Sequence, residues 1–193
     1  MRGICIALVV CLGAGPALAD VKTVVRTETY AVAGKSGEEL LDAMDRKGPR
    51  HGLRARAMAQ TRYEVDWKID WLKSDGKCRL NSADATLSIV YRYPALAGPT
   101  SPRLARRWKT FIAGVRRHEE MHGKIARQMV AAIHKSVSGR AVGNDRYCIK
   151  SQKKIERLIE AGYDKYEARQ ARFDDKEHAE GGNVDQLLDM LTR

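Results

Sequence analysis

The feature that most constrains the fold is a long stretch, from Ser101 to about Ser138, in which apolar residues recur every three or four positions. Ser101-Pro102 opens the stretch, and proline is well placed in the first turn of a helix. Spacing of three or four puts apolar side chains on one stripe of an α-helix, which must be buried against a second layer. The stripe consists of Leu104, Trp108, Phe111, Ile112, Val115, Ile125, Met129 and Ile133.

The first 19 residues are predicted to be a signal peptide rather than part of the fold. Arg2 provides a positive start, residues 4–12 are apolar, and Ala17-Leu18-Ala19 has the small residues that a signal peptidase reads, with cleavage before Asp20. The apolar run is too short for a permanent membrane span. We therefore expect an exported protein, periplasmic or secreted, with no transmembrane segment in the mature chain. A lipoprotein signal at Cys11 is the alternative, although Leu12 follows it and no small residues flank it.

Two cysteines remain after the signal peptide, Cys78 and Cys148. An even pair in a chain bound for an oxidising compartment predicts a disulfide. The alternatives are two separate buried thiols or zinc ligands, and neither cysteine has the neighbouring cysteine that a typical zinc motif provides.

The chain is strongly basic, with a net charge of +11. Such a surface favours acidic neighbours, and export argues for anionic envelope components and against nucleic acid. A basic surface without a specific partner is the simpler reading of the same composition.

The composition divides the mature chain, residues 20–193, into a strand-rich part (20–94) and a helical part (102–193). Residues 21–33 are rich in β-branched side chains, and residues 61–72 alternate strictly between apolar and polar. Asp75-Gly76 predicts a hairpin turn to a further strand at 78–93. The segment 95–102 is predicted to be a loop.

Helices complete the prediction. We expect a short one at 36–47, ended by Gly48-Pro49, and others at about 145–171 and 184–191. The expected fold is a single α+β domain, in which a small antiparallel sheet with one helix is followed by a zincin-like helical half.

The long helix contains the motif His118-Glu119-Glu120-Met121-His122. Two histidines four residues apart project from one face of a helix and can bind one metal ion. Glu119 can then take a proton from a water that zinc activates. The alternative is that His118 and His122 are core histidines satisfied by hydrogen bonds, since they lie on or beside the apolar stripe.

A zinc hydrolase needs a third protein ligand, and the spacings of the common families are missing here. We choose His178, which follows the second long helix at a point where the chain can turn back over the first; an exposed loop histidine is the alternative. Asp174 or Asp175 is expected to orient a ligand imidazole. The other acidic candidates for the third ligand are Glu156, Glu160, Asp164, Glu167, Asp174, Asp175 and Glu177.

The order of signal peptide, strand-rich start, HExxH helix and downstream histidine resembles bacterial predicted secreted zinc-dependent proteases, a family catalogued as a domain of unknown function. The resemblance covers most of residues 25–182. It rests on His118, Glu119 and His122, with Cys78 and Cys148 as a matching cysteine pair. The segment 173–178 is similar to a family stretch that ends in His-Gly, but Ala179 replaces the glycine.

These observations predict an exported zinc metallopeptidase that binds one Zn²⁺ per chain and cleaves a peptide or protein substrate, with Glu119 as general base. Two alternatives stay open. The first is a non-catalytic basic module that binds anionic envelope polymers, for which a closed four-ligand metal site would argue. The second is a zinc amidase acting on peptidoglycan peptides, which shares the chemistry and differs in substrate.

Overall fold

The long apolar stripe forms a single helix that runs along most of the molecule. In the computed structural model, which describes residues 21–51, 55–142 and 144–193, helix α2 spans Pro102–Val137. The Ser101 side chain caps it by accepting a hydrogen bond from the Leu104 amide. The predicted helix is confirmed at both ends. The predicted signal peptide, residues 1–19, lies outside the described residues.

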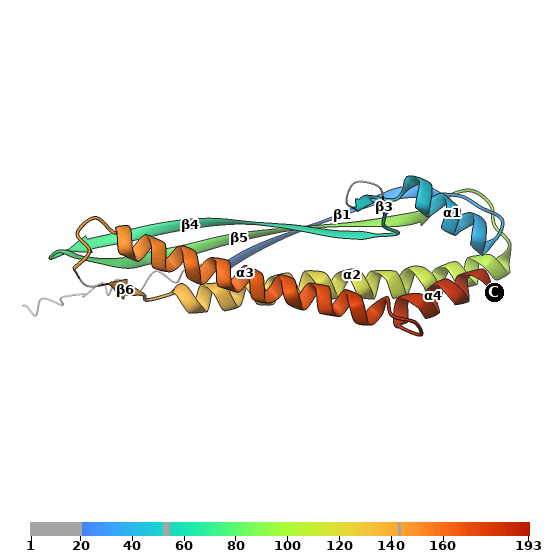
Figure 1. Ribbon diagram of the computed structural model, residues 1–193. Helices are drawn as coiled ribbons and strands as arrows, with labels where there is room; N and C mark the ends of the chain where they lie inside the picture. The colour runs from blue at the N-terminus through green and yellow to red at the C-terminus, as the bar shows by residue number, and fades with distance from the viewer. Residues whose placement is uncertain (1–20, 52–54, 143) are drawn as a thin grey trace, which may run out of the picture.

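A three-stranded sheet with one short addition forms the second layer (Figure 1). Its strands are β1 (Val21–Val32), β4 (Gln60–Ser74) and β5 (Lys77–Leu96), in the order β1-β5-β4, and β6 (Ala141–Val142) pairs with β5. The predicted hairpin is confirmed, with Asp75 and Gly76 both at positive φ in the turn. Strand β5 extends through Pro94 into the segment predicted to be a loop.

The prediction of an antiparallel sheet is wrong for β1, which pairs with β5 in parallel. The reason lies in the connection after β1. Helix α1 (Gly37–Lys47) and the small strands β2 (Arg50–His51) and β3 (Ala55–Arg56) reverse the chain, so that β4 runs back and β5 returns between β4 and β1. Strand β5 therefore runs in the direction of β1, and the sheet is mixed. The coarser α+β prediction holds.

The core fills the space between sheet and helices. Alternate residues of the central strand β5 point toward the helices and are buried. Helix α2 packs over them, and β1 and β4 flank them on the two sides. They form one cluster with buried residues of α2. The β5 members are Leu80, Ala83, Ala85, Leu87, Ile89, Tyr91 and Tyr93.

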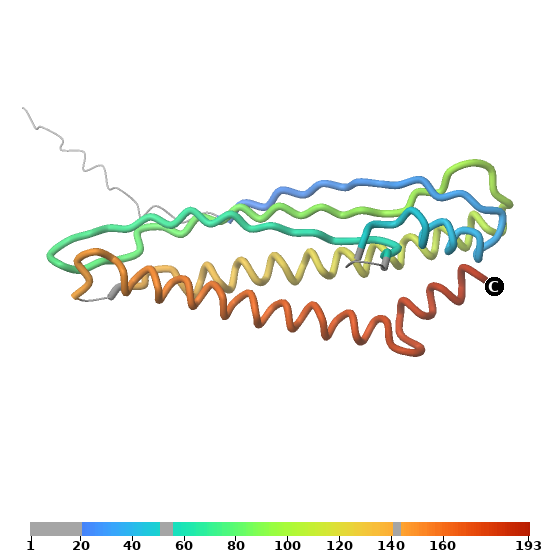
Figure 2. Tube along the Cα trace, turned by 45° about the horizontal axis from the view of Figure 1, so that its top comes forward, coloured from blue at the N-terminus to red at the C-terminus, as the bar shows by residue number. Residues whose placement is uncertain are grey.

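Helix α3 (Ile149–Glu177) runs back along α2, and α4 (Asn183–Thr192) follows it after a turn (Figure 2). The predicted disulfide is confirmed, since Cys78 and Cys148 are bonded and tie the hairpin to the start of α3. Helix α3 reaches Glu177, six residues beyond its predicted end at 171. That extension matters for the site, because it keeps the last acidic residues on a rigid element. No helix among the described residues is long and apolar enough to cross a membrane.

Candidate metal centre

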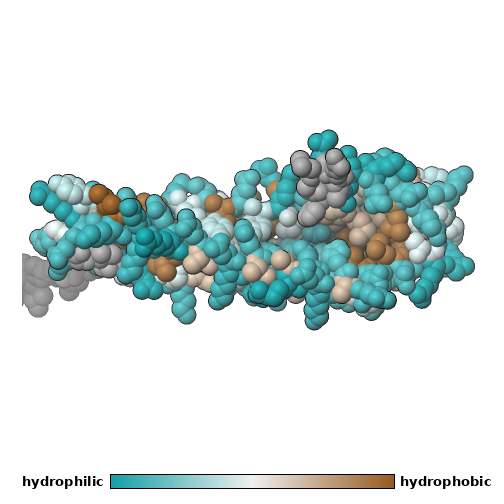
Figure 3. All heavy atoms as spheres, viewed as in Figure 1, coloured by the Kyte–Doolittle hydropathy of each residue, from teal (hydrophilic) through white to brown (hydrophobic). Residues whose placement is uncertain are grey.

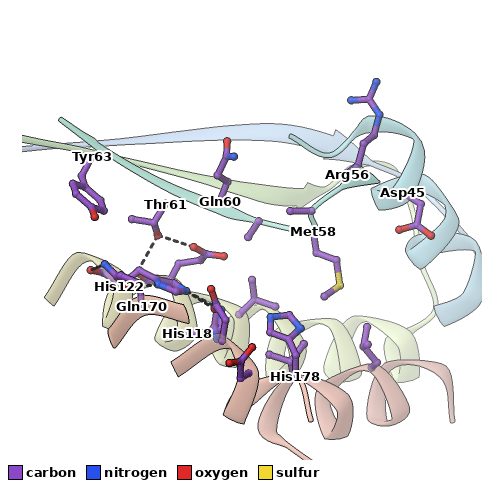
Figure 4. A pocket seen from close by; sticks show the side chains of 18 of the residues that line it. Asp45, Arg56, Met58, Gln60, Thr61, Tyr63, His118, His122, Gln170 and His178 are labelled. Carbon is purple, nitrogen blue, oxygen red and sulfur yellow. Dashed lines mark hydrogen bonds and ion pairs between the residues drawn. The ribbon is translucent and has the colours of Figure 1, made fainter. Parts of the chain in front are cut away.

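The motif residues lie in the middle of α2 and face α3 and the start of β4 (Figure 4). The side chains of His118 and His122 are nearly buried, with exposed fractions of 9% and 13%. Glu119 is buried. The i, i+4 spacing therefore brings the two imidazoles together as predicted, and their Nε2 atoms lie 3.1 Å apart.

The last turn of α3 adds a carboxylate to this pair. Asp174 Oδ1 lies 3.3 Å from His118 Nε2 and 2.9 Å from His122 Nε2. Asp174 was predicted either to orient a ligand imidazole or to be the third ligand, and the structure places its Oδ1 beside the Nε2 atoms of both motif histidines. It reaches them because α3 is still helical at this position.

His178, the predicted third ligand, is the C-terminal cap of α3 and is exposed. His118, Asp174 and His178 each offer one ligand atom, and these atoms all lie within 4.8 Å of one another. The rings of His118 and His178 are nearly perpendicular, with centroids 5.3 Å apart. The structure thus brings His178 to the site as a second candidate beside Asp174.

The spacing of the donor atoms fits zinc. With zinc–nitrogen bonds of about 2.0–2.1 Å, two ligand atoms of a tetrahedral site lie about 3.3 Å apart. The three separations among His118 Nε2, His122 Nε2 and Asp174 Oδ1 are 3.1, 3.3 and 2.9 Å. Two imidazoles and one carboxylate are also ordinary ligands of zinc. The donor set and its geometry therefore suit three corners of a tetrahedral zinc site.

Hydrogen bonds to Gln170 orient the His122 side chain and its backbone carbonyl. His122 Nδ1 lies 2.7 Å from Gln170 Oε1, and Gln170 Nε2 donates to the His122 carbonyl oxygen. In neutral His122, an Nδ1–H that donates to Gln170 leaves a lone pair on Nε2, so the hydrogen bond from Nε2 to Asp174 forms when the ring is protonated. On the other histidine, the buried Nδ1 of His118 makes no hydrogen bond within the described part of the chain, and Glu177 Oε2 lies 3.8 Å from it. No sequence motif marks Gln170, because its contact with His122 depends on how α3 is aligned with α2.

The Asp174 carboxylate and the His122 imidazole shift each other's pKa values. Burial raises the pKa of the Asp174 carboxyl, but hydrogen bonds from His118 and His122 outweigh burial and hold that pKa well below its usual range. Burial lowers the pKa of His122, yet its hydrogen bonds to Asp174 and Gln170 leave the net pKa above that of an ordinary histidine. Asp174 is thus ionised at neutral pH and is paired with both motif histidines.

Glu119 is held from the sheet side. Its Oε2 accepts a 2.6 Å hydrogen bond from Thr61 Oγ1, and the same hydroxyl lies 3.0 Å from the Glu119 carbonyl oxygen. Thr61 belongs to β4, so the sheet fixes the carboxylate that the motif predicts as general base. Sequence reasoning placed Thr61 in a strand but had no means of pairing it with Glu119.

The site opens into a cavity of about 850 Å³ between the start of β4, α1 and the helices. His118, Glu119, His122, Asp174 and His178 form one part of its wall. The other part is apolar, and Figure 3 shows apolar side chains gathered in a hollow at this end of the molecule. The apolar lining includes Leu41, Met58, Val115, Val184 and Leu188.

Fold and site together define an α+β protein with a histidine- and carboxylate-lined cleft between a sheet edge and a helical layer. The chain belongs to a bacterial family described as "Bacterial protein of unknown function (DUF922)", which it matches over residues 27–182. No curated protein and no solved structure matches it.

Proposed function

We propose that this protein is an exported zinc-dependent peptidase, with zinc held by His118, His122 and Asp174. The observation that carries the proposal is the triangle of donor atoms, spaced 2.9–3.3 Å apart, in the wall of a cleft. Zinc bound there would polarise a carbonyl group and lower the pKa of a water molecule. Three protein ligands would leave the fourth position of a tetrahedral zinc site for water or substrate.

Glu119 is the proposed general base. Its position directly after His118 places its carboxylate at the cleft, and Thr61 engages one of its two oxygens. The other oxygen can accept a proton from the attacking water and deliver it to the leaving amine. Thr61 is a positioning residue in this scheme, because it acts on substrate only through Glu119.

Two features favour a peptide as substrate. Strand β4 lies at an edge of the larger sheet, and its first residues line the cavity. The free edge of a strand can bind an extended peptide through backbone hydrogen bonds. The apolar part of the cavity lies beside the proposed zinc ligands, so we expect cleavage next to a large apolar side chain.

The first experiment measures zinc per chain in the protein from Asp20 to Arg193. We expect about one zinc in the wild type and almost none in His118→Ala or Asp174→Ala. His134→Ala is the matched control, because it removes a histidine from the same helix outside the cavity. Zinc-free wild-type protein after incubation with zinc would make the histidines structural and end the proposal. If Asp174→Ala keeps one zinc per chain and His178→Ala loses it, the third ligand is His178 and not Asp174.

The second experiment tests the chemistry. Glu119→Gln should keep its zinc and lose the ability to cleave a peptide mixture, with products read by mass spectrometry. Peptidoglycan stem peptides belong in the same panel, because an amidase would use the same residues. Cleavage by Glu119→Gln at the wild-type rate would refute the role of Glu119.

A non-catalytic metal-binding module is the second candidate, and the position of His178 favours it. If His178 joined His118, His122 and Asp174, four protein ligands would close the site. The two candidates differ when both variants are compared: a closed site would bind zinc more weakly in Asp174→Ala and in His178→Ala, whereas a catalytic site with three protein ligands would be weakened by only one of the two changes.

A further inference from the structure

Exposed apolar side chains gather at the end of the molecule opposite the cleft. Among the described residues, the strongly exposed large apolar side chains include Tyr147 at 69%, Ile149 at 56% and Leu72 at 45%. Tyr147 and Ile149 flank the disulfide-bonded Cys148, and Leu72 lies near the end of β4, shortly before the hairpin turn. Figure 1 shows the hairpin end and the start of α3 together, far from α1.

The exposure of Tyr147 and Ile149 is fixed by the fold. Cys148 is bonded to Cys78, and the Asp145 amide donates to the Gly76 carbonyl oxygen in the hairpin turn. The buried Asp145 carboxylate accepts hydrogen bonds from both the amide and the hydroxyl of Ser151 in the first turn of α3. Single exposed apolar residues are ordinary on protein surfaces. Here a braced loop presents two of them within three residues, whereas Leu72, which pairs with Arg79, lies on the sheet face away from the disulfide.

A basic face of α3 continues from this loop. This face has four exposed members. Three of them follow the first by three, four and seven residues, so all four lie on one side of the helix. They are Lys150, Lys153, Lys154 and Arg157. The opposite side of the same turns buries Ser151 and Ile155. None of the ion pairs within the described part of the chain involves these four residues. Lys73 and Lys77 add charge at the neighbouring hairpin.

We propose that this end of the molecule, the docking tip, binds the surface of a membrane that contains anionic phospholipids. The docking tip comprises the apolar residues Tyr147 and Ile149 together with the basic face of α3. Apolar side chains at the tip would enter the boundary between headgroups and acyl chains, while lysine and arginine side chains would contact phosphate groups. A tyrosine suits this boundary because its ring is apolar and its hydroxyl is polar.

The apolar part decides between a membrane and a water-soluble anionic polymer. A polymer would be attracted by the basic face alone, since it offers no apolar layer for Tyr147 and Ile149 to enter. A lipid surface binds both the apolar side chains and the basic face of the tip. The proposal does not depend on zinc or on catalysis, because the metal centre lies at the other end of α3.

Flotation of the chain from Asp20 to Arg193 with lipid vesicles tests the proposal. We expect binding to vesicles of phosphatidylcholine mixed with phosphatidylglycerol, and little binding to phosphatidylcholine alone. Tyr147→Ser/Ile149→Ser should lower the partition coefficient at least about tenfold, and Lys153→Gln/Lys154→Gln/Arg157→Gln at least about tenfold as well. Tyr147→Trp should bind more tightly than the wild type, which is a gain that misfolding cannot imitate.

Two control variants match these changes in type. Val25→Ser removes an exposed apolar side chain on β1, and Lys109→Gln/Lys124→Gln/Arg127→Gln removes three exposed charges from α2. Both should bind as the wild type does. Equal loss in the controls, absence of binding to anionic vesicles, or tip variants that bind normally would each overturn the proposal. Dextran sulfate, a soluble anionic polymer, provides the last comparison. If it displaces the protein fully from vesicles, and if Tyr147→Ser/Ile149→Ser does not change its binding, the partner of the tip is a polymer and not a membrane.

Discussion

Removal of the disulfide between Cys78 and Cys148 should cost the fold a large part of its stability. The bond joins residues 70 positions apart, so it closes a long loop in the unfolded chain. The chain-entropy relation for a loop of this length gives about 4.4 kcal/mol at 25 °C. Because natural domains have only about 5–15 kcal/mol of unfolding free energy, this is a large fraction. In a domain of this size, the loss corresponds to a fall in Tm of about 9–18 °C.

The measurement compares the wild type with Cys78→Ala/Cys148→Ala by urea denaturation, followed by circular dichroism. The variant should also show a steeper dependence on urea, because its unfolded chain is more expanded. Dithiothreitol should destabilise the wild type and leave the double variant unchanged. A loss below about 1 kcal/mol would show that the loop constraint contributes little and would refute the entropic reasoning. If the proposed zinc site exists, zinc binding below the lowered Tm should persist, since His118 and His122 lie in the middle of α2 and Asp174 lies near the end of α3 that is far from the disulfide.

Three further changes test the contacts around the site and the docking tip. Thr61→Val should cost about 1–3 kcal/mol in urea denaturation, because it removes the hydrogen bond to buried Glu119; the cost should shrink in a Glu119→Ala background. Gly123→Ala should cost about 1–3 kcal/mol, because the added methyl group would overlap the Tyr91 hydroxyl, and Tyr91→Phe should recover part of the loss. Burial raises the pKa of Asp145, but hydrogen bonds from the first turn of α3 hold it below the usual value, so its stabilisation is present at neutral pH and lost in acid. The stability difference between the wild type and Asp145→Asn should therefore begin to shrink as the pH falls below about 4 and be lost as the pH falls through the lower pKa of the folded state; a difference that stays constant in acid would contradict this account.

The elements defined by local patterns were predictable from the sequence. The apolar stripe predicted α2 within a residue at each end, and Asp75-Gly76 predicted the hairpin turn. The direction of β1 was not predictable, because alternation shows that a segment is a strand but does not identify its partner. The parallel pairing of β1 with β5 arises from the chain reversal through α1, which is a tertiary feature.

The same division holds for the site. His118, Glu119 and His122 share one helix, so their geometry followed from the helical repeat alone. Asp174, Gln170 and Thr61 reach the site only because α3 and β4 pack against α2 at one particular height. The sequence marked the segment around His178 as a source of ligands, but it did not show that Asp174 would lie closest to both histidines.

Helix α3 connects two fixed points, the disulfide at Cys148 and the carboxylate of Asp174. Each residue added to a helix rotates the downstream part of that helix by about 100° and advances it by about 1.5 Å. A single insertion between these points would turn Asp174 away from α2, and an insertion of seven residues would restore the direction but move the carboxylate by about 10 Å. Members of the family can therefore vary in length at the hairpin turn, where nothing downstream changes register, but the interval from the second cysteine to this aspartate should tolerate no insertion or deletion.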